Sequence, residues 1–183
     1  MSEEGLHVPH EGHGTTPLSQ RVAIFTALLA ALGAVVGFEG SHLMNEVLLK
    51  KNEAVLHKSE ATNEWNHYQA TSTKAHLAEL AQELVAPERA QQFDEKIKKY
   101  TAQKDELLAK ARTLDAASER ADHEAEHLNG PHTLFAGAMI FLQIAISLAS
   151  ITALTERQWL LWVAFISAFA GVGLCGWALV IGG

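Results

Sequence analysis

The chain is poor in the residues that cross-link or interrupt a polypeptide. Among its 183 residues there are one cysteine and four prolines. The lone thiol, Cys175, has no second cysteine for an intrachain disulfide, so cysteine usage says nothing about the redox compartment. Neither glycine nor proline occurs between Phe93 and Leu128. That stretch can therefore form one uninterrupted helix.

Charged side chains are missing from three long runs. These runs are residues 22–38, 132–155 and 158–183. Each is close in length to the roughly 17–25 apolar residues that cross a bilayer as a helix. Glutamates and histidines precede the first run and no small-residue cleavage signature follows it, so a retained span is favoured over a cleaved signal peptide. We predict transmembrane helices at residues 21–39, 131–155 and 158–181.

Several functional classes lack their usual residues. The three runs contain no acidic residue and no lysine, which ion-coupled carriers place at mid-membrane. This argues against such a carrier and leaves a passive pore open. The chain also lacks a nucleophile elbow, a phosphate-binding loop and a dinucleotide fingerprint, so neither an enzyme class nor a cofactor is indicated. The formal net charge is −7 without a basic stripe, so no nucleic-acid partner is expected.

A heptad repeat is present in the second half of the chain. Steps of four and three residues connect Phe93, Ile97, Tyr100, Lys104, Leu107, Ala111, Leu114, Ser118, Ala121, Ala125 and Leu128. A 3.5-residue repeat keeps one stripe of a helix against a partner helix. The upstream stretch is the obvious partner, and Pro87 separates the two. We predict a long antiparallel coiled-coil hairpin over residues 40–130, with arms at 40–86 and 88–129.

The stripe of the first arm has a different composition. Its small, polar and aromatic members are Val47, Lys51, Ala54, Lys58, Ala61, Trp65, Tyr68, Ser72 and Ala75. Toward the tip, the apolar face is predicted to shift to Leu77, Leu80 and Leu84. The polar middle of this arm faces either another subunit or water, or it fits small residues against the large ones of the second arm. The second interpretation is favoured.

Residues unfavourable to helices mark two further boundaries in the chain. Residues 1–20 hold several glycines and prolines and are predicted to form a disordered tail. His7, His10 and His13 recur there, and a solvated tail is favoured over weak metal binding. At the second boundary, the sequence Asn129-Gly130-Pro131 is predicted to stop the second arm before the next span begins.

Polar and small residues inside the spans suggest helix contacts. Gln143, Ser147 and Ser150 share one helical face, where they would either bond to a neighbouring helix or line a pore. In the third span, Ser167, Gly171, Gly173 and Gly176 predict close packing.

The segment His123-Glu124-Ala125-Glu126-His127 matches the H-E-x-x-H pattern. On a helix, the two histidines lie one turn apart and could share a zinc ion, with Glu124 as a base. Only His132 lies close downstream as a third ligand. A metalloprotease and a metal or pH-sensitive site of His123, His127 and His132 are both weaker interpretations than a solvated face.

Residues 65–74 resemble a family signature, W-x-x-[YF]-Q-[AS]-x-S-x-K. The matching residues are Trp65, Tyr68, Gln69, Ser72 and Lys74. We associate this signature with the bacterial domain-of-unknown-function 4337 family, which segments 21–26 and 141–147 resemble too. The resemblance implies a three-span bacterial membrane protein with a helical hairpin, and it implies no activity.

The sequence as a whole predicts an all-α integral membrane protein. We expect a non-enzymatic, oligomeric scaffold or accessory subunit, whose partners are membrane lipids and further copies or a larger membrane complex. A homo-oligomeric channel is the alternative, and a membrane-proximal metal site or metalloprotease comes third. Arg21 and Arg157 abut their spans, which predicts a cytoplasmic amino terminus and a periplasmic hairpin at the inner membrane.

Overall fold

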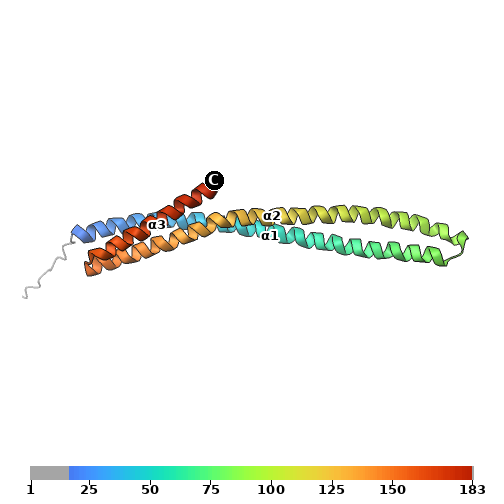
Figure 1. The fold of residues 1–183 in the computed structure, drawn as a ribbon, viewed down its shortest axis with the longest axis horizontal. Coiled ribbons are helices and arrows are strands. Elements are labelled where there is room, and N and C mark those ends of the chain that lie inside the picture. Colours follow the sequence, from blue (N-terminus) through green and yellow to red (C-terminus); the bar gives the residue numbers. More distant parts are fainter. Residues whose placement is uncertain (1–16, 183) are drawn as a thin grey trace, which may run out of the picture. The chain divides into compact units, whose positions relative to one another are not determined.

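The computed structural model describes residues 17–182, which form three α-helices (Figure 1). Helix α1 spans Pro17–Leu84, α2 spans Pro87–Thr155 and α3 spans Gln158–Gly182. The predicted all-α class is confirmed. By length and composition, each helix contains a stretch apolar enough to cross a membrane. The described residues divide into two compact units, one of residues 17–40 and 133–182 and the other of Ser41–His132.

Helices α1 and α2 both begin with a proline, Pro17 and Pro87. Proline suits the first turn because its missing N–H would have no partner there in any case. The start at Pro17 places residues 17–20 in the helix, so the predicted tail reached four residues too far. Residues 1–16, including the three histidines of the tail, lie outside the part of the chain that the structure describes.

Helix α2 continues through Asn129-Gly130-Pro131, so the prediction that the arm stops there is wrong. Proline removes one backbone hydrogen bond and crowds the preceding turn, at a cost of about 3 kcal/mol in a helix interior. The helix is buried on both sides of this point, at Ala125 and at Phe135. Packing on either side therefore outweighs the local preference of the sequence.

Helix α2 ends at Thr155, and the residue that follows it, Glu156, has a left-handed backbone conformation. Glu156 has φ 54°, and its N–H donates to the Thr152 carbonyl at 2.8 Å. This is the backbone of a helix C-cap, in which glycine is the usual residue. The turn redirects the chain within two residues, because α3 starts at Gln158.

Small residues bring helices together in the unit of residues 17–40 and 133–182. The buried positions of α2 follow steps of three and four: Phe135, Ala138, Leu142, Ala145, Ala149 and Thr152. On α3, Ser167 and Gly171 are buried, and the Ser167 hydroxyl donates to the Phe141 carbonyl of α2 at 2.7 Å. A hydroxyl can reach a backbone carbonyl only where two helices approach closely, as small residues permit in membrane helix pairs.

We predict that Gly171→Val destabilises this unit by about 1–3 kcal/mol, the usual cost of overpacking. A Cβ at this position would lie 3.1 Å from both the Ala138 carbonyl oxygen and the Leu142 Cγ. The matched control is Gly173→Val, because a Cβ at Gly173 would meet no described atom within 4 Å. Thermal unfolding of the full chain in mild detergent, followed by circular dichroism, measures both. Equal midpoints for the two variants would contradict the close α2–α3 contact.

Candidate functional site

In the unit Ser41–His132, pairs of polar side chains connect α1 to α2. In order along α1, the pairs are Lys51–Asp122, Lys58–Asp115, Glu64–Lys110 and Gln82–Asp94. The N–O distances of the first two are 2.5 and 2.9 Å. Residue numbers rise along α1 while they fall along α2, so the two segments run in opposite directions (Figure 1).

The two predicted stripes lie along the same contact, and Lys51 and Lys58 belong to the α1 stripe. Every position of the α2 stripe is buried or half-buried, with Ala111, Ser118, Ala121 and Ala125 buried and the remaining ones half-buried. Phe93, Ile97, Tyr100, Leu107, Leu114 and Leu128 belong to the half-buried set. On α1, every predicted stripe position except the exposed Lys58 is buried or half-buried. Alanine is therefore the residue at the centre of the contact, and the larger side chains cover its edges.

The tip of the first arm differs from the prediction. Leu77, Leu80 and Leu84 are between 54% and 86% exposed, so the expected shift of the apolar face onto them is wrong. Ala75 and Ala78 are buried instead. The α2 stripe supplies large side chains at this end, at Phe93 and Ile97, so small residues on α1 complete the contact.

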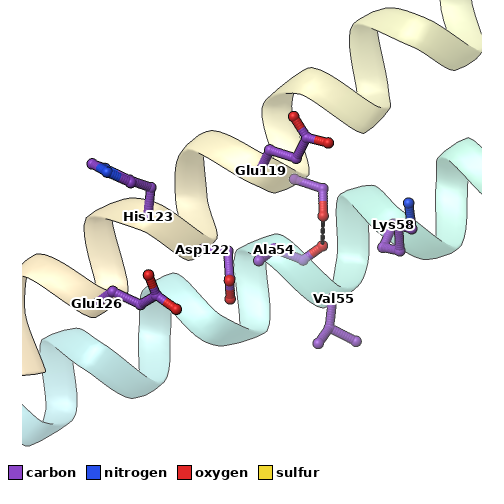
Figure 2. Close-up of a pocket in the computed structure, with 8 residues that line it drawn as sticks. Ala54, Val55, Lys58, Glu119, Asp122, His123 and Glu126 are labelled. Carbon is purple, nitrogen blue, oxygen red and sulfur yellow. Dashed lines mark hydrogen bonds between the residues drawn. The ribbon is translucent and has the colours of Figure 1, made fainter.

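Ser118 is the polar residue at the centre of the stripe. It is buried, and its hydroxyl donates to the Ala54 carbonyl of α1 at 2.8 Å (Figure 2). The carbonyl has a second lone pair for this bond beside its helical one. The contact satisfies a buried hydroxyl and fixes which residue of α1 lies opposite Ser118.

Asp115 binds two side chains of α1. Its carboxylate accepts hydrogen bonds from the Trp65 indole at 2.8 Å and from Lys58 at 2.9 Å. The Trp65 ring stands edge-on to Tyr68, with centroids 5.7 Å apart. The bond from Trp65, followed by that from Lys58, holds the pKa of Asp115 below its ordinary value, and the bond to Asp115 raises the pKa of Lys58.

Sequence reasoning missed Asp115. Lys58 and Trp65 are seven residues apart on the predicted α1 stripe, so their shared face was available from the sequence. Their common partner on α2 was not, because it depends on the register of the two arms. The register follows only from the contacts, for example from Ser118 lying opposite Ala54.

The structure does not assemble the predicted three-histidine site. Among the described residues, no group of three or more histidine, cysteine, aspartate or glutamate side chains is placed to hold a metal ion. The rings of His123 and His127 are 4.5 Å apart, and both residues are exposed. At about 100° per residue, His132 lies on the opposite face of the helix from His123.

Glu124, the candidate base of the H-E-x-x-H pattern, has a different partner. Lys50 lies 2.7 Å from its carboxylate and 3.2 Å from that of Glu53. The hydrogen bond with Glu124 raises the pKa of Lys50 and lowers that of Glu124. A carboxylate stabilised in its charged form in this way is a weak proton acceptor, since a general base works best with a pKa near the operating pH.

A shallow groove of about 450 Å³ lies beside these residues. Its lining consists of Ala54, Val55, Lys58, Ser118, Glu119, Asp122, His123 and Glu126. Asp122 points toward α1, whereas His123 points away from it (Figure 2). The groove is bordered by the polar contacts of the helix pair, and these contacts already engage Lys58, Ser118 and Asp122.

The family-signature residues divide between two faces of α1. Trp65, Tyr68 and Ser72 are half-buried on the face toward α2, and Gln69 and Lys74 are exposed. The signature therefore combines contacts of the helix pair with residues on the outer surface.

The two serines of the second apolar segment form hydrogen bonds within their own helix. Ser147 donates to the Gln143 carbonyl and Ser150 to the Ile146 carbonyl, each at 2.9 Å. Both serines and Gln143 are exposed. Serine commonly satisfies itself on the carbonyl four residues back. The expected bond across a helix interface comes instead from Ser167 on α3.

Comparison with known proteins identifies the family. The model of the family described as Domain of unknown function (DUF4337) matches residues 18–181. The chain belongs to this family, as its signature residues predicted. In the comparisons with curated proteins and with solved structures, nothing matches the chain.

We predict that Asp115→Asn lowers the thermal midpoint by a few degrees at pH 7, because it removes the charge that Lys58 contacts. The folded pKa of Asp115 lies below its unfolded value, so its contribution is complete at neutral pH and is lost as the pH falls below about 4. The difference between wild type and variant should therefore shrink between pH 5 and pH 3 or below. Exposed Asp105→Asn is the control, measured by circular dichroism. A difference that stays constant with pH would contradict the role of this charge.

Proposed function

We propose that this DUF4337 family member is a non-enzymatic, oligomeric membrane scaffold or accessory subunit. In this proposal it crosses a bilayer three times and holds residues 41–132 outside the bilayer as an antiparallel coiled-coil hairpin. The observation that carries the proposal is the distribution of exposed apolar side chains. Exposed apolar side chains cover the three apolar segments, as contact with lipid requires. Others occur on the unit Ser41–His132, whose sequence is too charged to enter a membrane.

Membrane insertion is supported by the surface of the unit containing residues 17–40 and 133–182. Leu154, Phe169 and Val180 are each at least 76% exposed. Apolar surface on this scale on a water-soluble protein would promote association, whereas it is favourable against acyl chains. Trp159 and Trp162 stand at the start of α3, where aromatic rings suit the boundary between headgroups and hydrocarbon.

The structural role of the hairpin is supported by how its polar side chains are used. Lys50, Lys51 and Lys58 each contact an acidic residue of α2. A single exposed ion pair contributes little to the free energy of unfolding, but a series of such pairs fixes the register of two long helices. The 44 residues of α1 from Ser41 to Leu84 correspond to a rod of about 65 Å, which suits a spacer or a docking arm.

The proposed location is the inner membrane of a bacterial cell. Three spans place the amino terminus and the turn at Glu156-Arg157 on one side and the hairpin on the other. Arg21 and Arg157 lie beside their apolar segments, and positive residues beside spans favour the cytoplasm. The hairpin would then be periplasmic.

We predict that the protein is a homo-oligomer in the membrane. Native mass spectrometry and mass photometry from mild detergent should show multiples of the 19.9 kDa chain. The physical reason is the apolar surface that stays exposed on the hairpin unit. A single 19.9 kDa species at every concentration, with no larger complex in native membranes, would refute the scaffold proposal.

Orientation has its own test. In a Cys175→Ser background, His10→Cys and Ala90→Cys are labelled on whole cells with a thiol reagent that cannot cross the inner membrane. Residue 90 should react and residue 10 should not. The reverse pattern would place the hairpin in the cytoplasm.

A further inference from the structure

A second heptad stripe follows the face of α1 that is turned away from α2. Steps of four and three residues connect its members, which we call the outer stripe: Asn45, Leu49, Asn52, Leu56, Ser59, Asn63, Asn66, Ala70, Thr73, Leu77, Leu80 and Leu84. Every one of these twelve residues is exposed, and none is charged or a histidine. The stripe lies entirely within the unit Ser41–His132.

The position of the outer stripe follows from helix geometry. Its members lie two residues before those of the α1 stripe that was predicted to face α2, as Leu49 does before Lys51 and Leu56 before Lys58. Two residues correspond to about 200° around a helix. The outer stripe therefore faces almost directly away from α2, and no side chain of the described unit covers it.

Helix α2 provides an internal comparison. The stripe at the same offset consists of Gln91, Glu95, Lys98, Ala102, Asp105, Ala109, Arg112, Ala116, Glu119, His123 and Glu126. All eleven are exposed and six of them are charged, as is usual for a helix face in water. The face of α1 has the same exposure without the charges. Five of its twelve positions are leucine, with Leu49 68% and Leu56 57% exposed.

We propose that the outer stripe binds the outer stripe of a second copy of this chain, as a parallel, in-register coiled coil. This inference rests on the proposed function, because membrane insertion sets the relative direction of the two α1 helices. Helix α1 is continuous from its apolar segment into the arm. Two copies inserted in one bilayer with the same orientation have arms that leave on the same side, with equivalent residues at the same level.

The residues of the outer stripe suit such a register. Leu49, Leu56 and the three leucines near the tip would each pack against their own counterparts. Asn52, Asn63 and Asn66 would also meet their counterparts, and paired side-chain amides can satisfy one another. A shifted register would set an asparagine against leucine, which is how a buried asparagine fixes register and the number of strands in a coiled coil.

The residues flanking the outer stripe are compatible with the same arrangement. In a parallel pair, the flanking side chains that meet across the interface are Leu48–Glu53, Val55–Glu60, Thr62–His67, Gln69–Lys74 and His76–Ala81. None of these pairs brings like charges together. Lys50 of the same chain lies 3.2 Å from Glu53, and His57 lies 3.5 Å from Glu60.

Disulfide trapping tests the pairing directly. In full-length Cys175→Ser protein, Leu56→Cys and Leu80→Cys are introduced one at a time and oxidised mildly in native membranes. Both should give disulfide-linked dimers, because equivalent positions of a parallel pair bring Cβ atoms within bonding reach. Ala109→Cys, on the exposed face of α2, is the control and should stay monomeric on denaturing gels. Equal dimer yields at Leu56, Leu80 and Ala109 would overturn the proposal.

Direction is tested by mixing two variants. If the two α1 helices ran antiparallel about a centre between Asn63 and Asn66, Leu56 would lie opposite Thr73. Coexpressed Leu56→Cys and Thr73→Cys chains should therefore give Leu56–Leu56 and Thr73–Thr73 dimers in the proposed arrangement. Disulfides formed only between position 56 and position 73 would overturn it.

A second measurement separates this inference from the proposed function. Leu56→Lys with Leu80→Lys should raise the dissociation constant of the oligomer at least about tenfold, as expected when central apolar contacts are lost. Ala109→Lys with Ala116→Lys should leave it unchanged. All four positions are exposed, so folding should persist, and circular dichroism verifies it. If the leucine variant stays as oligomeric as wild type, the outer-stripe inference fails while the scaffold proposal stands. If wild type itself is monomeric, both fail.

Discussion

The close approach of α1 and α2 along alanine-centred stripes is the constraint on which the unit Ser41–His132 depends. Ala54, Ala61, Ala111, Ala121 and Ala125 are buried there, although alanine offers little apolar surface. What alanine offers is proximity, which lets Ser118 reach a backbone carbonyl and lets lysines of α1 reach acids of α2. Larger side chains in the same places would hold the helices apart and leave these groups to water.

The H-E-x-x-H segment takes part in the same helix pair. Glu124 of the H-E-x-x-H pattern is paired with Lys50, and the downstream His132 lies on another face of α2. Trp65, the first residue of the family signature, bonds to Asp115 of the opposite helix. Glu124 and Trp65 thus both contribute contacts between α1 and α2. The leucines that this pairing leaves exposed are the residues available for other partners.

Two predictions about α1 and α2 were wrong for a related reason. Pro131 was expected to end a helix because a proline in a helix interior costs free energy. Burial of α2 before and after Pro131 nevertheless keeps the helix continuous. Leu77, Leu80 and Leu84 were expected to face α2 because they are apolar, yet the stripe continues through Ala75 and Ala78. In both places the sequence supplies a local preference, and the neighbouring helix decides whether that preference prevails.

The sequence by itself determined the helical class, the three apolar segments, the heptad stripes and the family, because these depend on periodicity, composition and residue identity along the chain. Only the tertiary structure decided the register that sets Asp115 against Lys58 and Trp65, the Ser167 contact between α3 and α2, and which leucines stay uncovered. A heptad repeat specifies a face of a helix but not the level at which a second helix lies against it. That level comes from contacts between residues far apart in the chain.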